Sequence, residues 1–293
     1  MDQWALIYYY WNDCADKEVW RDMQNPIIPA IATFRANNVT APIFVIDSSN
    51  KRNDWSCFPF RLKFEVLRRE PYLGHSPTNN LNGTQMKLFS RAFDVPALAS
   101  EIDADCYVFS DGDIFWMKDM LPYPEPIDGI YCNPVNNGLY YWNRGSESAS
   151  RFFGLWQQEI MDGVSDFRRR TEILSCYYAG VFNDEAAYCS VRARNPGLVK
   201  DIGWYDNCAD PSPDQHVVEN TKNIHFCGSL FGVRRGMYGL MIREFYEKIR
   251  IHLTEAEVVR IYGDKAMHLA GAFTLSQLHK ARLKLNDRRK LFL

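Results

Sequence analysis

The sequence lacks the features that mark a membrane protein or a disulfide-stabilised secreted domain. None of its apolar runs reaches the ~18 residues that suggest a membrane-spanning helix. The 8 cysteines are scattered, without a CxxC pair or the spacing of a zinc site, and no secretory leader is evident. We therefore expect a protein of a reducing compartment, with a cytoplasmic location.

The sequence also lacks an excess of charge of either sign. Its 34 Lys and Arg residues stand against 36 Asp and Glu residues, which gives a formal net charge of −2. Such a balance provides no global attraction to nucleic acid or to anionic membranes. There is no internal repeat and no low-complexity tract. At 293 residues, 46% of them hydrophobic, the chain can bury the core of one large domain or of two fused ones.

Two apolar runs near the N-terminus, 4–11 and 42–47, predict buried strands, and helical spacing over about 16–38 predicts a helix between them. This order indicates a parallel, right-handed crossover unit, in which ligands bind beyond the carboxyl ends of the strands. Tyr8 and Asp47 are therefore candidates for binding the base and ribose of a nucleotide. The alternative is that Tyr8 lies in the core and Asp47 caps a turn.

The most informative stretch is 105–116, where an apolar run ends in Asp111-Gly112-Asp113 and then becomes apolar again. Residues i and i+2 of an extended chain point to the same side, so both carboxylates can converge on one object. Because like charges repel, a half-buried pair favours a divalent cation. Gly112 would let a phosphate approach the backbone without meeting a Cβ atom. The alternative is a strand end followed by an ordinary Asp-Gly turn.

Basic side chains that could neutralise a diphosphate occur on both sides of this motif. Lys87 and Arg91 lie one turn apart on a helix predicted to begin near Asn82. Arg234 and Arg235 belong to a glycine-rich loop of the kind that binds phosphate. The alternative in both places is a solvated basic surface.

Other candidate residues follow the motif. Asn137 lies at the start of a predicted strand, 136–143, and His225 stands in a short apolar stretch, where a core histidine is the alternative. Asp184 and Glu185 open a predicted helix, where the helix dipole alone would favour carboxylates. A further helix is predicted over about 146–162. The last eighteen residues combine six basic residues with one aspartate and several leucines, which indicates an amphipathic basic helix.

In their order along the chain, these features resemble the nucleotide-sugar-dependent glycosyltransferases of the GT-A fold, particularly the type that includes glycogenin and the bacterial lipooligosaccharide galactosyltransferases. The resemblance covers roughly residues 1–235. It departs from the family at Glu185, where Gln is usual, and at Ala186, where a second Asp is usual. The Lys that normally follows the late His-x-x-Gly is absent, and Arg234 or Arg235 would take its place.

The resemblance implies a metal-dependent enzyme that moves a sugar from a nucleotide-diphosphate sugar to an acceptor hydroxyl. Oxygen ligands with one imidazole suit Mn²⁺ or Mg²⁺, with Mn²⁺ favoured by the imidazole. The metal ligands would be Asp111, Asp113 and His225, and Asp184 or Glu185 would act beside the anomeric carbon. The donor-binding residues would be Tyr8, Asp47, Lys87, Arg91, Ser110, Asn137, Arg234 and Arg235.

The sequence thus predicts an α/β protein with a mostly parallel, Rossmann-like sheet flanked by helices. A catalytic domain is expected over 1–237, with a nucleotide-binding half (1–113) and an acceptor and metal half (114–237), followed by a basic helical extension over 238–293. The acceptor stays open among glycans, glycolipids, proteins and modified nucleic acid, and the basic tail leaves peripheral membrane attachment open. The alternatives are a Mg²⁺-dependent phosphatase of the haloacid-dehalogenase type and a non-catalytic sugar-binding protein.

Overall fold

The computed structural model describes most of the first 201 residues and one later strand. The ranges described are 4–11, 27–37, 40–50, 55, 62–75, 81, 83–112, 114–116, 128–132, 137–177, 180–201 and 223–225. Several predictions lie outside these residues and stay predictions: the extension 238–293 and the roles of Asp113, Arg234 and Arg235.

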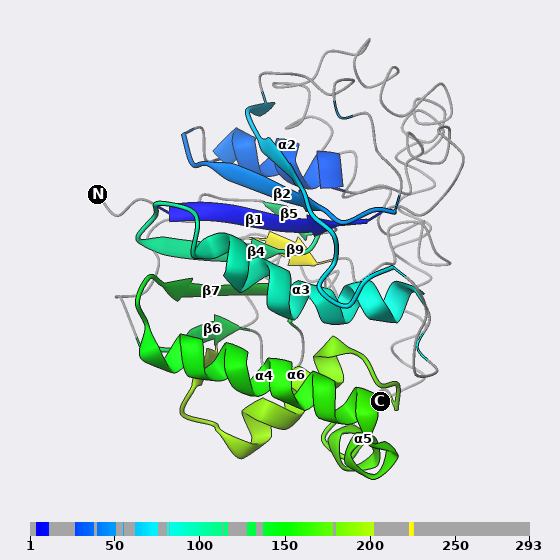
Figure 1. The fold of residues 1–293 in the computed structure, drawn as a ribbon. Coiled ribbons are helices and arrows are strands. Elements are labelled where there is room, and N and C mark those ends of the chain that lie inside the picture. The colour runs from blue at the N-terminus through cyan, green and yellow to red at the C-terminus, as the bar shows by residue number, and fades with distance from the viewer. Residues whose placement is uncertain are drawn as a thin grey trace, which may run out of the picture.

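The main sheet has seven strands in the order β3-β2-β1-β4-β7-β6-β8 (Figure 1). All neighbouring strands are parallel except at β7, which runs antiparallel to both β4 and β6. A second sheet consists of two antiparallel strands, β5 and β9. The strands are β1 (Trp4–Tyr10), β2 (Ile43–Asp47), β3 (Glu65–Arg68), β4 (Cys106–Ser110), β5 (Ile114–Trp116), β6 (Ile130–Cys132), β7 (Leu139–Asn143), β8 (Val199–Asp201) and β9 (Asn223–His225).

Helices cover both faces of the sheet, as the uninterrupted apolar sequence of β1 requires. Because strand side chains alternate, Trp4 points to the face covered by α2, where its ring contacts Phe34 at a centroid distance of 5.5 Å. Tyr9 points to the opposite face, where α3 lies, and α4 and α6 extend that layer over β7 and β6 (Figure 1). The helices are α2 (Ile27–Asn37), α3 (Gly83–Ala99), α4 (Glu147–Ser165), α5 (Phe167–Leu174) and α6 (Asp184–Arg194).

The core between the sheet and the α3, α4 and α6 layer is rich in aromatic rings. Tyr140 of β7 stacks on Phe109 of β4 at 4.7 Å and meets Trp156 of α4 edge-on at 5.9 Å. Tyr188 of α6 contacts Trp156 at 6.0 Å. Such ring pairs add to the free energy gained by burying their surface, so these aromatic residues stabilise the core.

The predicted mostly parallel sheet flanked by helices is confirmed, and so are the strands at 4–10, 43–47, 106–110 and 139–143. The predicted helix over 16–38 is found over 27–37, and residues 16–26 lie outside the described ranges. The sequence interpretation missed α5 and β8, which are short and carry no distinct periodicity. Among the described residues, no helix is long and apolar enough to span a membrane.

An acidic side chain is buried between α3 and β1. Asp94 is 8% exposed and accepts hydrogen bonds from the Tyr9 hydroxyl (2.9 Å) and the Tyr72 backbone N–H (3.3 Å). Burial raises the pKa of Asp94 from its ordinary value of 3.8 to about 6, although both hydrogen bonds lower it. The folded protein therefore holds this proton more tightly than the unfolded chain does.

We expect Asp94→Asn to stabilise the protein at neutral pH. Because the folded state binds more protons, wild-type stability falls as pH rises from about 4 to about 6, and that loss persists above pH 6. Asn keeps an acceptor oxygen for Tyr9 but cannot ionise, so the variant should gain roughly 1–3 kcal/mol at pH 7 and little at pH 4.5. Urea unfolding between pH 4.5 and 8 measures the difference. A difference that does not change with pH would contradict the prediction.

Candidate active site

The carboxyl ends of β1, β2 and β4 meet at one edge of the sheet, because these strands are parallel. The chain leaves β4 at Ser110 and turns at once, with the Ile114 N–H donating to the Asp111 carbonyl at 3.2 Å. Antiparallel β7 begins at the same edge, since Leu139 is paired with Ser110. The Asp111 N–H donates to the Gly138 carbonyl at 2.7 Å, so Asn137 is brought beside Asp111.

The β5–β9 sheet brings His225 to the same place. Ile114, the residue that follows Asp113 in the chain, is paired with His225. The His225 side chain is 3% exposed, and its Nε2 atom lies 3.6 Å from Oδ2 of Asp111. β5 is itself held on α2, where the Thr33 hydroxyl accepts from the Trp116 N–H at 3.0 Å. Two residues that are 114 positions apart in the sequence therefore face each other.

A buried arginine of α3 lies behind this pair. The Arg91 Nη1 atom donates to Oδ1 of Asp111, and its Nε atom donates to Oδ2 of Asp184, both at 2.5 Å. Its Nη2 atom donates to the Asn137 side-chain oxygen at 2.8 Å, and the guanidinium lies over the ring of Phe109 at 5.4 Å. Burial alone would lower the pKa of Arg91, but Asp111 and Asp184 outweigh it and raise the pKa above its ordinary value. The cation is thus permanently charged.

The N-terminus of α6 supplies two further carboxylates. Asn183 caps the helix, with its side chain accepting from the Ala186 N–H at 2.8 Å. Asp184 is 1% exposed and also accepts from Nδ2 of Asn137 at 3.0 Å. Glu185 accepts a short hydrogen bond from the Tyr177 hydroxyl. Burial raises the pKa of Glu185, the Tyr177 bond lowers it, and the neighbouring Asp184 charge raises it.

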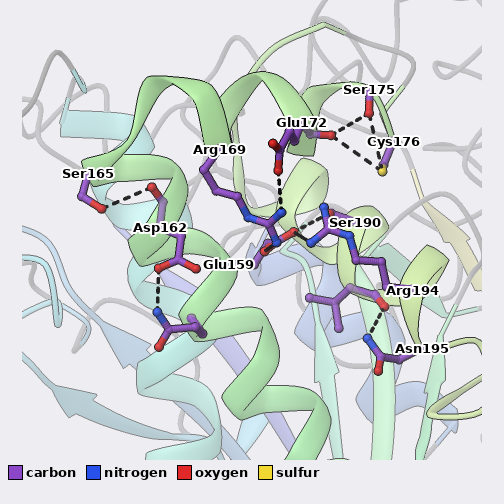
Figure 2. Close-up of polar contacts among 12 residues, drawn as sticks. Glu159, Asp162, Ser165, Arg169, Glu172, Ser175, Cys176, Ser190, Arg194 and Asn195 are labelled. Carbon is purple, nitrogen blue, oxygen red and sulfur yellow. Dashed lines mark hydrogen bonds and ion pairs between the residues drawn. The ribbon is translucent and has the colours of Figure 1, made fainter.

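The α6 helix is fixed to α4 and α5 by ion pairs that converge on the buried Glu159 (Figure 2). Glu159 of α4 accepts from Arg194 of α6 at 3.1 Å, from Arg169 of α5 at 2.6 Å, and from the Ser190 hydroxyl. Glu159 is 5% exposed, so its charge needs these partners. In addition, the Trp156 indole N–H donates to the Asp184 carbonyl at 2.8 Å. The position of the site carboxylates on α6 is therefore set by the whole helical layer.

Phe182, which precedes the α6 cap, is fixed from three sides. Its ring lies 5.0 Å from that of Phe89 and 5.2 Å from the Arg170 guanidinium, and its carbonyl accepts from Gln85 at 3.2 Å. On α4 it packs against the backbone of Gly163, where an added Cβ atom would lie 2.3 Å from the Phe182 Cζ atom. Glycine is required there by the close approach of the ring.

The structure brings six of the sequence-predicted site residues into this arrangement: Arg91, Asp111, Asn137, Asp184, Glu185 and His225. Ser110 is adjacent but fully buried, with its hydroxyl donating to the Asp111 carbonyl at 3.2 Å. Lys87 is 1% exposed and lies one turn before Arg91. Neither basic residue of this helix is solvated, which was the alternative reading of the pair.

Three residues lie in environments other than those that the sequence led us to expect. Tyr8 is fully buried in the core beside Trp116 and Ser110, so its ring offers no surface to a nucleotide base. Asp47 does lie at the carboxyl end of β2, but it is 1% exposed and its carboxylate accepts from the Ser49 N–H and the Trp55 indole. What approaches Gly112 is α2, because an added Cβ atom would lie 3.3 Å from that of Ile27. Its lack of a side chain therefore serves helix packing.

Some residues of the site were not found from the sequence. Tyr177, Trp156 and Phe182 position the α6 carboxylates, but each belongs to an apolar pattern that also describes ordinary core residues. Phe182 directly before an Asn-Asp-Glu helix start was the one available signal.

The described part of the site fits a divalent cation. Among the described residues no three His, Cys, Asp or Glu side chains form a metal-binding group, and the third predicted ligand, Asp113, is outside them. The 3.6 Å between Nε2 of His225 and Oδ2 of Asp111 is close to the ~3 Å separating neighbouring ligands of an ion with bonds of about 2.1 Å. A carboxylate oxygen and an imidazole are also suitable donors for Mn²⁺.

Together, the sheet order, the late β5–β9 pair and the helical layer define the GT-A glycosyltransferase fold. The bifunctional glycosyltransferase WbbM is similar over 89% of this chain, with a TM-score of 0.53 and 11% identity, and this chain spans 52% of that one. The galactosyltransferase LgtC, solved with donor and acceptor sugar analogs, is similar over 85% of this chain and 96% of its own, with a TM-score of 0.45 and 12% identity.

Mouse xyloside xylosyltransferase 1 is similar over 77% of this chain and 98% of its own, with a TM-score of 0.46 and 12% identity. At the level of sequence, no protein-family model and no curated protein matches the chain. The likeness to WbbM, at 11% identity, establishes the fold and nothing further.

Proposed function

We propose that the protein is a glycosyltransferase that moves a sugar from a nucleotide-diphosphate sugar to an acceptor hydroxyl, with a divalent ion held by Asp111, Asp113 and His225. The observation that carries the proposal is the approach of His225 to Asp111 at the carboxyl edge of a GT-A sheet. Asp111 directly follows β4 of the main sheet, whereas His225 belongs to β9 of the second sheet, where it pairs with Ile114, the residue that follows Asp113 in the sequence.

The chemistry of the reaction explains why these residue types are needed. A nucleoside diphosphate leaves with several negative charges, and a bound Mn²⁺ or Mg²⁺ would act as a Lewis acid on its oxygens. We assign the neutralisation of the remaining negative charge on the diphosphate to three basic residues: Lys87, Arg234 and Arg235. Lys87 lies one turn before Arg91 on α3, and Arg91 binds Asp111, which supports assigning Lys87 to the same region.

Of the two α6 carboxylates, Glu185 is better suited to act as a general base. The Oδ2 atom of Asp184 is already engaged within the protein, because it accepts hydrogen bonds from both Arg91 and Asn137. Burial raises the pKa of Glu185, which makes it a stronger base than an ordinary carboxylate. An inverting reaction would use this base to remove the proton of the acceptor hydroxyl. In a retaining reaction, Asp184 and Glu185 would instead stabilise the positive charge that develops on the sugar.

The fold argues against the phosphatase alternative. A haloacid-dehalogenase phosphatase keeps its Asp-x-Asp strand near the N-terminus, whereas here β1, β2 and β3 all precede β4 in the chain. Asp111, which would be the nucleophile, is bound by Arg91 instead.

A thermal-shift screen of UDP, GDP, CDP and ADP, each with and without Mn²⁺, tests the proposal. We expect one nucleotide to stabilise the protein in an Mn²⁺-dependent manner, because a ligand that binds the folded state raises its stability by mass action. The matching nucleotide sugars are then assayed for hydrolysis, and p-nitrophenyl phosphate serves as the phosphatase control. Phosphatase turnover without nucleotide binding would overturn the proposal. Sugar binding that persists in EDTA, without turnover, would indicate a binding protein.

A further inference from the structure

The Arg91 side chain is committed to partners within the protein. Each of its three nitrogens donates to a different partner: Nε to Asp184, Nη1 to Asp111 and Nη2 to Asn137. The residue is 5% exposed, and Phe109 covers one face of the guanidinium. A diphosphate could engage this cation only after some of these contacts were broken.

Asn137 is committed in the same way. Its side-chain oxygen accepts from Arg91 and its Nδ2 atom donates to Asp184, so the amide closes a ring of hydrogen bonds with these two residues. Asn137 is 2% exposed. The expectation that Arg91 and Asn137 contact the donor is therefore not supported by their contacts, although both lie at the site.

We propose that Arg91 is a positioning residue that acts through Asp111 and Asp184, with Asn137 as its second support. This inference rests on the proposed function. By holding Oδ1 of Asp111, Arg91 leaves Oδ2 directed at His225, where the ion would bind. With the same planar group it holds Asp184 at the start of α6. One cation thus fixes the distance between the metal ligand and the sugar-facing carboxylate.

The geometry requires arginine rather than a positive charge alone. A guanidinium carries five donors in a rigid plane and can bind three partners at once, whereas a lysine ammonium is a flexible point charge. Arg91→Lys therefore keeps the charge beside Asp111 but loses the fixed geometry. This substitution separates positioning from simple charge neutralisation.

The experiment compares the wild type with Arg91→Lys, Asp184→Asn and the double variant. Loss of an outer-shell partner typically costs 10–100-fold, so Arg91→Lys should weaken Mn²⁺ binding about 10-fold and lower kcat by about 10–100-fold. Mn²⁺ binding is followed by electron paramagnetic resonance without nucleotide, and the affinity for UDP at saturating Mn²⁺ should stay within about threefold of wild type. Because Arg91 acts in part through Asp184, the loss of kcat in the double variant should be smaller than the product of the two single losses.

Arg144→Lys is the matched control, because Arg144 pairs with the exposed Asp103 at the opposite edge of the sheet. It should leave all these quantities unchanged. If Arg91→Lys does not fold well enough to assay, Asn137→Ala removes the second support and should lower kcat with unchanged affinity for UDP.

Three results would overturn the inference: unchanged Mn²⁺ affinity and kcat in Arg91→Lys, an affinity for UDP that falls in parallel with kcat, or single-variant effects that multiply in the double variant. If the wild type bound Mn²⁺ but no nucleotide, the proposed function would fail by itself. The positioning role would then be decided by Mn²⁺ affinity and by melting temperatures, where the decrease in the double variant should be smaller than the sum of the single decreases.

Discussion

Replacing Asp111 by Asn should abolish Mn²⁺-dependent turnover, with an expected loss of at least about 10³-fold. The amide has lost the negative charge that binds the ion, and its nitrogen donates hydrogen where Arg91 or the ion needs an acceptor. A 10³-fold loss corresponds to about 4 kcal/mol of transition-state stabilisation, which is within the range of a metal ligand. The measurement is the initial rate of nucleotide-sugar hydrolysis over a series of Mn²⁺ concentrations.

The control for this variant is Asp103→Asn. Asp103 makes the same kind of ion pair, with Arg144, but its side chain is 95% exposed and lies at the opposite edge of the sheet. The Asp103→Asn variant should retain wild-type turnover and the wild-type dependence of turnover on Mn²⁺. Full activity of Asp111→Asn at ordinary Mn²⁺ concentrations would refute the metal site that we propose.

Gly163→Ala should destabilise the protein and also lower turnover, although Gly163 is not one of the proposed site residues. The new Cβ atom would lie 2.3 Å from Cζ of Phe182 and 2.9 Å from Cδ1 of Ile173, so the ring must move. Overpacking of this kind costs about 1–3 kcal/mol, and Phe182 stands two residues before Asp184. A shift of about 1 Å in a catalytic group can cost about 10²-fold in rate. Urea unfolding and kcat measurements follow the two effects.

The same helix contains its own control. Gly154 also lies within α4, but an added Cβ atom would meet nothing within 4 Å. Gly154→Ala should therefore stabilise the protein by roughly 0.5–1 kcal/mol, because alanine loses less conformational freedom in a helix than glycine does. We therefore expect the free energy of unfolding to fall in Gly163→Ala and to rise in Gly154→Ala. A stabilised Gly163→Ala protein would show that the Phe182 ring moves aside at no cost and would contradict the prediction.

The strands at the centre of the sheet could be predicted because they are buried on both faces. Such strands are nearly continuous apolar runs, as in β1, and the acids that follow them mark the ligand edge. The short elements could not be predicted in this way. β8 has three residues and only Val199 is buried, so its position depends on pairing with β6 rather than on its own sequence.

The structure brings six of the predicted site residues together, but the sequence did not predict which residues they contact. Arg91 was a candidate for diphosphate binding or for a solvated surface, and the structure gives it neither environment. Its partners Asp184 and Asn137 lie 93 and 46 positions away, and helical spacing contains no information about such distant contacts. The environment of Tyr8 is decided by its own strand. Because β1 is buried on both faces, Tyr8 lies in the core, although its hydroxyl made it a candidate for ligand binding.

The β5–β9 pair makes the proposed metal site depend on strand register. Successive side chains of a strand point to opposite sides, so a slip of one residue between Ile114 and His225 would turn the imidazole away from Asp111. Each strand has only three residues, and two strands of that length are marginally stable without other support. An insertion or deletion in this pair could therefore remove the third ligand while every residue of the seven-stranded sheet stayed in place.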